Sequence, residues 1–263
     1  MALSLDSFKK PQAGRPPRII LLGTEKVGKS TFAAGAPAPV FIPVKGETGI
    51  DELNVDCSDP VASYDEVIGL LGLLYESEHP YKTVVIDSSS ALEPLVVATA
   101  MRREGVESQS KLGGGYGHQD DTPLAMWRQI TEGLDALRDD RGMASIVIGH
   151  VTVKPFSDPL TETYDAFEWD VRAKLRNMLF RWADCILFAN RKAYITKEEA
   201  GFNKKTKRGV SDDARYLYTQ KRPGHPGGGR GVYGHLPYEI PLKWSAFQDA
   251  VLNAQSKTES EQK

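Results

Sequence analysis

The segment Gly23–Ser30 reads GTEKVGKS and matches the pattern G-x-x-x-x-G-K-[S/T]. Gly23 and Gly28 allow the backbone to turn with positive φ and to approach a phosphate closely. The exposed amides of such a loop, with the start of the helix that follows, bind anions. An apolar run, Arg18–Leu22, precedes the loop, and a short helix is expected over Lys29–Ala34. The sequence therefore predicts a nucleotide-binding loop between a buried strand and a helix.

Each fixed residue of this loop has a chemical role. The lysine, Lys29, reaches the β- and γ-phosphates, and the hydroxyl of Ser30 ligates Mg²⁺. The expected cofactors are therefore ATP and Mg²⁺. The residues predicted to contact the nucleotide are Gly23, Thr24, Glu25, Lys26, Val27, Gly28, Lys29, Ser30 and Thr31.

A carboxylate that ends a buried strand is the usual second contact of the metal, directly or through water. The apolar run Thr83–Ile86 stops at Asp87, which we predict to be that carboxylate. Ser88 follows, and two interpretations of it are open: it supports the metal shell, or it caps the next helix.

Two further polar residues follow predicted strands on the side of the nucleotide. Glu47 lies just after the strand Val40–Val44 and is the best candidate to orient the attacking water, although the adjacent Lys45 also allows an exposed loop glutamate. His150 ends the strand Ala144–Gly149, where polar residues sense the γ-phosphate. A purely structural histidine is the alternative. Glu47, Lys29 and His150 are the candidate catalytic residues.

Strands and helices alternate along residues 18–254, which predicts one α/β domain with a mostly parallel sheet and helices on both faces. Antiparallel strands, Ala193–Thr196 and Tyr216–Thr219, are expected to extend it toward the C-terminus. Residues 1–17 are predicted to be a flexible arm and residues 255–263 a disordered tail.

Composition is that of an ordinary soluble protein, with 40% hydrophobic and 26% charged residues and a formal net charge of −2. Bulk charge therefore neither favours nor excludes a nucleic acid partner. No apolar run is long enough to span a membrane, and the first residues do not form a signal peptide. Cys57 and Cys185 are expected to be reduced thiols, and no zinc site is expected.

With the phosphate loop, the Asp87 strand and the His150 strand, the chain resembles RecA-like ATPases. More narrowly, it resembles the phage recombination ATPases of the "Sak four" single-strand-annealing type. The stretches that carry this resemblance are Tyr81–Leu92, Leu134–Lys154, Asp158–Asp165, Trp182–Asn190 and Leu236–Phe247. The lysine-to-arginine segment of that family falls on Gly224–Arg230, where only Arg230 matches.

The resemblance implies a RecA-like core, ATP and Mg²⁺ dependence, and single-stranded DNA as a partner. It also implies action with a single-strand-binding protein, assembly into a homo-oligomeric ring or filament, and the cytoplasm of a bacterial host. DNA loops of such proteins follow the strands that end here at Asp87 and His150. The corresponding candidates for DNA contacts are Lys111, Tyr116, His118, Lys154 and Phe156, with ordinary surface loops as the alternative.

By analogy, a basic residue of such a protein reaches the γ-phosphate held by a neighbouring subunit. The candidates for this finger are Lys221, Arg222 and Arg230. The basic run Asn203–Arg208 is either a phosphate-tracking segment or a solvated hairpin tip.

The leading hypothesis is therefore an ATP-hydrolysing DNA recombination or annealing protein. A nucleotide-gated DNA or protein binding module with negligible turnover remains open, because the register of Glu47 is uncertain. A small-molecule kinase would need an arginine-bearing lid, which we do not find. A GTPase would need an Asn-Lys-x-Asp motif, and Asn203–Thr206 lacks the aspartate.

Overall fold

The computed structural model describes residues 14–157, 162–200 and 204–261. At 193–200, 204–213, 259 and 261 it describes the backbone alone. In this part of the chain the strands form one ten-stranded sheet, in the order β10-β8-β7-β1-β5-β4-β2-β3. Outside this order, β6 pairs with β5 and β9 pairs with β7. The strands are β1 (Arg18–Gly23), β2 (Pro39–Pro43), β3 (Asp56–Cys57), β4 (Thr83–Asp87), β5 (Ala144–Phe156), β6 (Tyr164–Trp169), β7 (Cys185–Ala200), β8 (Lys204–Tyr218), β9 (Gly228–Gly229) and β10 (Glu239–Pro241).

The strands at the centre of the sheet are parallel, whereas β8, β9 and β10 pair antiparallel. The α-helices are α1 (Lys29–Ala34), α2 (Tyr64–Glu76), α3 (Ser89–Glu104), α4 (Asp121–Asp140), α5 (Ala173–Trp182) and α6 (Trp244–Glu261), with 3-10 helices η2 (Gln109–Gly114) and η3 (Gly231–His235). None of the helices among the described residues is long and apolar enough to cross a membrane.

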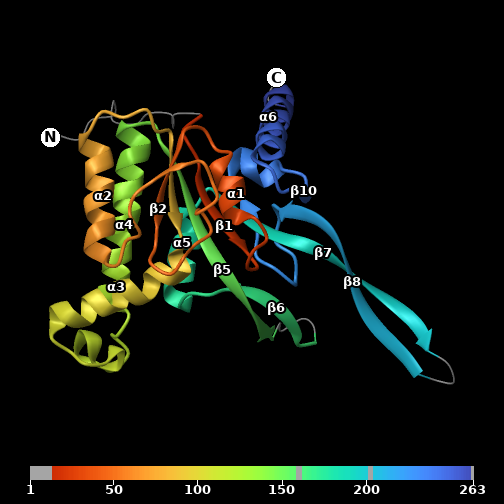
Figure 1. Cartoon of the computed structure of the whole chain (residues 1–263), viewed down its shortest axis with the longest axis horizontal. Coiled ribbons are helices and arrows are strands. Elements are labelled where there is room, and N and C mark those ends of the chain that lie inside the picture. Colours follow the sequence, from red (N-terminus) through yellow and green to blue (C-terminus); the bar gives the residue numbers. More distant parts are fainter. Residues whose placement is uncertain (1–13, 158–161, 201–203, 262–263) are drawn as a thin grey trace.

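Helices cover both faces of the sheet (Figure 1). Ile20 and Leu22 of β1 pack into a core with residues of α2, α3, α4 and α5. Ile19 and Leu21 of the same strand pack into a second core with residues of α1 and α6. A strand buried on both faces reads as a continuous apolar run, which is why β1 is recognisable in the sequence. The predicted architecture is therefore confirmed: an α/β core with a mostly parallel sheet, helices on both faces and an antiparallel C-terminal extension.

The segment after His150 differs from the prediction of a loop. β5 continues through Phe156 and pairs antiparallel with β6 to form a hairpin. Lys154 and Glu168 form an ion pair of 3.0 Å across it, and the rings of Phe156 and Tyr164 lie 5.4 Å apart. Such cross-strand pairs stabilise a hairpin whose residues are too polar to announce a buried strand.

The C-terminal part of the chain is also more regular than expected. β7 runs as one strand from Cys185 through Ala200, whereas a separate short strand was expected over Ala193–Thr196. Figure 1 shows β7 and β8 leaving the sheet as a long two-stranded ribbon. Helix α6 continues to Glu261 instead of ending at Ala254. The hydroxyls of Ser256 and Thr258 donate to carbonyls one turn earlier, at Leu252 and Ala254, so polar side chains are compatible with a helix here.

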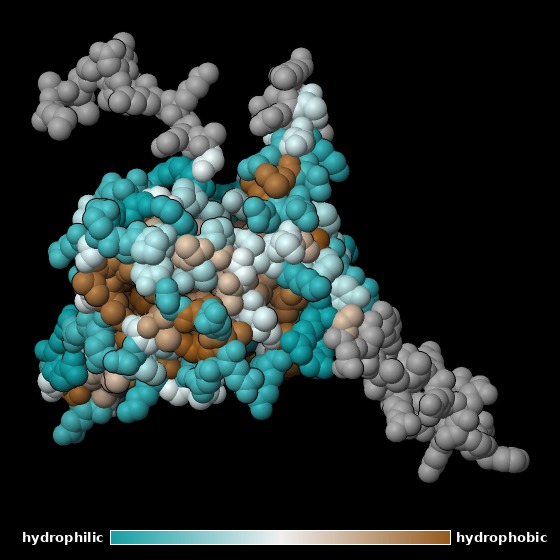
Figure 2. Space-filling model, turned by 45° about the horizontal axis from the view of Figure 1, so that its top comes forward, coloured by the Kyte–Doolittle hydropathy of each residue, from teal (hydrophilic) through white to brown (hydrophobic). Residues whose placement is uncertain are grey.

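Helix α6 stands out from the body of the molecule in both Figure 1 and Figure 2. The face drawn in Figure 2 carries hydrophobic areas scattered among hydrophilic residues. Large apolar side chains that the structure leaves exposed include Leu252 on α6 and Val153 and Phe156 on the β5–β6 hairpin.

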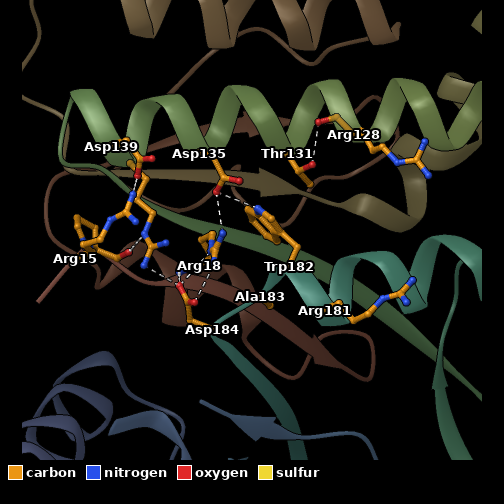
Figure 3. A network of polar contacts seen from close by, with 12 residues as sticks. Arg15, Arg18, Arg128, Thr131, Asp135, Asp139, Arg181, Trp182, Ala183 and Asp184 are labelled. Carbon is orange, nitrogen blue, oxygen red and sulfur yellow. Dashed lines mark hydrogen bonds and ion pairs between the residues drawn. The ribbon is translucent and has the colours of Figure 1, made fainter. Parts of the chain in front are cut away.

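A polar network ties the starts of β1 and β7 to helix α4 (Figure 3). Arg18 donates to Asp184 at 2.9 Å and to Asp135 at 3.1 Å, and Arg138 forms an ion pair of 3.1 Å with Asp184. At the near end of the predicted arm, Arg15 forms an ion pair with Asp139. The rest of that arm, residues 1–13, lies outside the described residues, so its flexibility stays a prediction.

Asp184 is expected to be the sensitive member of this network. Burial alone would raise the pKa of its carboxyl, but hydrogen bonds from Arg18 and the charges of Arg18 and Arg138 lower it overall. Asp184→Asn removes the ion-pair partner of the largely buried Arg138 and one of the two carboxylates that contact Arg18, and it should lower the free energy of unfolding by about 3 kcal/mol at pH 7. Urea denaturation measures this change, and Asp139→Asn, at a half-exposed carboxyl, should cost less than about 1 kcal/mol.

The pH dependence of that difference follows from the sign of the pKa shift. Because the folded-state pKa of Asp184 lies below its usual value, the carboxylate contributes stability above that usual value and loses it as the pH falls through the folded-state pKa. The gap between the wild type and Asp184→Asn should therefore stay level near neutral pH and shrink as the pH falls from about 5 to about 3. A gap that is constant across this range would contradict the assignment.

Candidate nucleotide-binding site

The phosphate loop connects β1 to α1 at the carboxyl edge of the sheet. Gly28 has φ 105° and is the N-terminal flanking residue of α1, so the conformation at this position favours glycine. The ammonium of Lys29 is buried and donates to the carbonyls of Gly23 at 3.0 Å and Thr24 at 2.9 Å. The lysine is thus folded back over its own loop, in a position to exchange these carbonyls for phosphate oxygens.

The two predicted metal ligands lie side by side. The Ser30 hydroxyl donates to a carboxylate oxygen of Asp87 at 2.6 Å. Asp87 comes from the end of β4, whereas Ser30 lies in the first turn of α1, which follows β1, and β5 lies between these two strands. A hydroxyl and one carboxylate are hard oxygen ligands of the kind that Mg²⁺ uses together with substrate phosphates.

A glycine keeps the space beside this pair open. A Cβ on Gly49 would lie 2.9 Å from the Ser30 hydroxyl oxygen and 3.9 Å from an Asp87 carboxylate oxygen. Burial raises the pKa of Asp87, opposed by its hydrogen bond from Ser30, and the nearby charge of Glu47 raises it further. A cation beside Asp87 would relieve both unfavourable contributions. The residues present therefore fit a magnesium ion.

We expect Gly49→Ala to weaken binding of Mg·ATP about 10-fold, because the added methyl group crowds the space beside Ser30 and Asp87. Calorimetric titration with Mg·ATP and with ATP in excess EDTA separates metal-dependent from metal-free binding. The loss should appear mainly in the presence of Mg²⁺. Gly69→Ala is the control, because an added Cβ there meets nothing within 4 Å. Equal losses with and without Mg²⁺ would contradict a metal position at Gly49.

Glu47 and His150 contact each other, and His150 also contacts Lys29. His150 Nε2 lies 2.9 Å from a carboxylate oxygen of Glu47, and its Nδ1 lies 3.4 Å from the Lys29 ammonium. An ammonium only donates, so Nδ1 accepts and Nε2–H donates to Glu47. A neutral imidazole with its proton on Nε2 therefore links the phosphate-binding lysine to the candidate water-orienting carboxylate.

The surroundings of Glu47 keep it ionised. Its carboxylate accepts from His150 and, at 2.5 Å, from the Ser88 hydroxyl. The hydrogen bond from His150 lowers the pKa of Glu47 most, burial raises it by less, and the hydrogen bond from Ser88 lowers it further, so that the pKa lies below its usual value. Ser88 also accepts from the amide of Ala91 as the N-cap of α3. The structure thus places Ser88 as a helix cap and as a partner of Glu47.

One cavity of about 770 Å³ is lined by Lys29, Ser30, Glu47, Asp87 and His150. The cavity also contains residues that sequence reasoning missed: Lys45, Gly46, Thr48, Gly49, Ser90, Ala91, Asp170 and Arg215. Ser90 holds the amide of His150 at 3.0 Å. Gly46 and Thr48 flank Glu47 in the sequence and were within reach of prediction, whereas Asp170 and Arg215 come from distant segments that carry no local signal.

The two predicted DNA regions do not have the same character. Lys111 lies in η2 between α3 and α4, and Tyr116 follows it fully exposed with φ 53°. His118 Nδ1 lies 2.9 Å from a carboxylate oxygen of Asp121. Lys154 and Phe156, in contrast, lie on the β5–β6 hairpin and line a groove of about 370 Å³.

The candidate finger residues lie apart from the nucleotide cavity of their own chain. Lys221 and Arg222 line the groove that contains Lys154 and Phe156, and the Arg222 guanidinium lies 4.2 Å from the ring centre of Tyr238. Arg230 donates to the carbonyl of Ala183 at 2.5 Å and approaches Asp184 to 3.7 Å. Arg230 thus contacts the same carboxylate, Asp184, as Arg18 and Arg138. The side chains of the basic run at 204–208 lie outside the described residues, as does Asn203.

Fold and site together define a nucleotide-binding α/β protein with a P-loop. A model of the AAA domain family matches residues 15–231, and the chain belongs to this family. Membership agrees with nucleotide binding at the P-loop. No curated protein matches the chain. Among solved structures, the crystal structure of the RadB recombinase is similar, with 15% identity and a TM-score of 0.43 over 81% of this chain and 86% of that one.

Proposed function

We propose that the protein binds ATP with Mg²⁺ and hydrolyses it. The observation that carries this proposal is the convergence of Lys29, the Ser30–Asp87 pair and the His150–Glu47 pair in one cavity. Lys29 would bind the β- and γ-phosphates, and Ser30 and Asp87 would hold the metal. The bound Mg²⁺ would neutralise charge on the phosphate oxygens. Catalysis of this kind depends on positioning and electrostatics.

Glu47 is the residue that we assign to the water. Its carboxylate is ionised and accepts from His150 and Ser88. The Ser30 hydroxyl donates to Asp87 instead. An ionised carboxylate can orient a water and accept its proton as the water attacks. His150 contacts both Glu47 and Lys29, so it is suited to register whether Lys29 is bonded to phosphate.

We further propose that the protein is a phage-type recombination or annealing protein that binds single-stranded DNA. Two features support this proposal: the resemblance of the sequence to phage recombination ATPases, and the groove lined by the β5–β6 hairpin. The groove combines aromatic and cationic side chains: Lys154, Phe156, Tyr164, Phe167, Phe180, Lys221 and Arg222. Stacking of bases on aromatic rings, together with cations for the backbone, is the usual basis of single-strand binding.

The test of this function is phosphate release at steady state, measured with and without single-stranded DNA of increasing length. We expect Mg²⁺-dependent release that DNA stimulates. DNA binding without release would indicate a nucleotide-gated binding module, and the absence of both would overturn the proposal. Particle size measured in the same samples tests the expected homo-oligomer, and addition of a single-strand-binding protein tests that partner.

Phe156→Ala should weaken single-stranded DNA binding by about 5-fold or more, since loss of one stacking ring costs about 1–3 kcal/mol. Phe156 is 46% exposed, so its removal should not unfold the domain. Val153→Ala, three residues earlier on the hairpin and outside the groove, is the control. Fluorescence anisotropy with a labelled oligonucleotide measures both at fixed salt. Unchanged DNA affinity in Phe156→Ala would remove this groove from the proposal.

A further inference from the structure

Arg215 on β8 reaches across the sheet to the phosphate loop. Its Nη1 lies only 3.0 Å from the position that a Cβ on Gly28 would occupy, and its Cδ lies 3.9 Å from the same position. Leu242, just after β10, places a methyl group 3.7 Å from that position. The absence of a side chain at Gly28 therefore allows an arginine of the antiparallel extension to lie directly against the loop.

The backbone around Arg215 holds it in this place. Arg215 pairs with Arg191 of β7 two positions before the buried Leu217, and its carbonyl accepts from the amide of Leu242 at 3.0 Å. Arg215 is thus anchored at the junction of β7, β8 and the segment after β10, while its guanidinium points to the mouth of the cavity that contains Lys29 and Ser30.

The guanidinium of Arg215 differs in its contacts from those of several other arginines. Arg18, Arg138 and Arg172 all form ion pairs with carboxylates. The guanidinium of Arg215, by contrast, has no hydrogen-bond or ion-pair partner among the residues that the structure describes. A planar cation with its donors free, exposed at the edge of a phosphate-binding loop, is suited to bind phosphate oxygens.

We propose that Arg215 binds the nucleotide in cis, at the α- and β-phosphates. The amides of the loop around Gly28 cradle these two phosphates, whereas Lys29 reaches the β- and γ-phosphates. Arg215 lies beside Gly28, so its contact is with phosphates that ATP and ADP share. It is a ground-state binding residue, unlike a finger that acts at the γ-phosphate. This inference rests on the proposed function and adds a nucleotide contact outside the motif.

The experiment is calorimetric titration of the full chain with Mg·ADP and with a non-hydrolysable Mg·ATP analogue. Arg215→Ala should weaken both by the same factor, about 10-fold or more, because a hydrogen bond to a charged group is lost. Arg215→Lys should retain part of the affinity, since it keeps the charge but not the planar fork. Arg191→Ala, the exposed neighbour on the adjacent strand and outside the cavity, should leave both affinities unchanged.

Three results would overturn the inference. Wild-type affinity of Arg215→Ala for both nucleotides would show that the arginine makes no contact. A loss confined to the ATP analogue would place it at the γ-phosphate. A loss confined to Mg·ADP would contradict a contact with phosphates that both nucleotides share. The proposed function fails separately, in the wild type: if the wild-type chain binds neither nucleotide, the site itself is wrong, whatever Arg215 does.

Discussion

Lys29→Ala will lower the affinity for Mg·ATP and Mg·ADP by at least about 100-fold, and ATP turnover will be lost with it. The ammonium is buried beside the loop and already donates to two carbonyls there. These donors, turned to the phosphates, make charge-assisted hydrogen bonds of about 1.5–3 kcal/mol each. Burial lowers the pKa of Lys29, although the charges of Asp87, Glu47 and Glu25 oppose this. A bound polyanion favours the charged ammonium further.

Calorimetry with both nucleotides measures this loss, and thermal denaturation shows whether the variant remains folded. Lys82→Ala is the matched control, because Lys82 is an exposed lysine just before β4 and outside the cavity. A Lys29→Ala protein that is folded and binds nucleotide as the wild type does would remove Gly23–Ser30 from the nucleotide site. Because Lys29 also contacts His150, Lys29→Arg tests whether a cation of different shape can restore binding.

The parts of the fold that were predictable are those whose residues are buried on both faces. The central strands β1, β4 and β5 read as apolar runs because each is covered by helices on either side. The β5–β6 hairpin was not predictable in this way. Its residues are largely exposed and include Pro155, and its stability comes from pairs across the strands such as Lys154 with Glu168. Those pairs depend on register, which single-strand patterns do not show.

The residues of the candidate site also fall into a predictable and an unpredictable group. Asp87 and His150 each follow an apolar run, and Lys29 lies after the loop that follows another. Parallel strands bring their carboxyl ends to one edge of the sheet. Topology therefore sufficed to expect them together, and the structure brings them into one cavity. Arg215 comes from an antiparallel strand whose register sets which residue faces Gly28. Gly49 contributes only the space that its missing side chain leaves open. No local sequence pattern therefore predicts a role for Arg215 or for Gly49.

Glu47→Gln should reduce the turnover of ATP by about 100-fold or more, the range expected when a group that accepts a proton is lost, while nucleotide affinity stays close to wild type. The amide retains an oxygen that can accept from His150 and Ser88, so the local structure should persist. It loses the negative charge and the ability to accept a proton from water. Single-turnover phosphate release measures the chemical step, and titration with Mg·ADP measures binding.

The split between the two measurements is what identifies the role of Glu47. Glu52→Gln makes the same chemical change at an exposed glutamate a few residues further along and should leave both quantities unaltered. If Glu47→Gln turns over ATP within about 2-fold of wild type, the carboxylate serves only to hold His150, because a group that orients or deprotonates water contributes more than this. If affinity falls as much as turnover, the charge acts on binding. Only slow chemistry with intact binding assigns Glu47 to the attacking water.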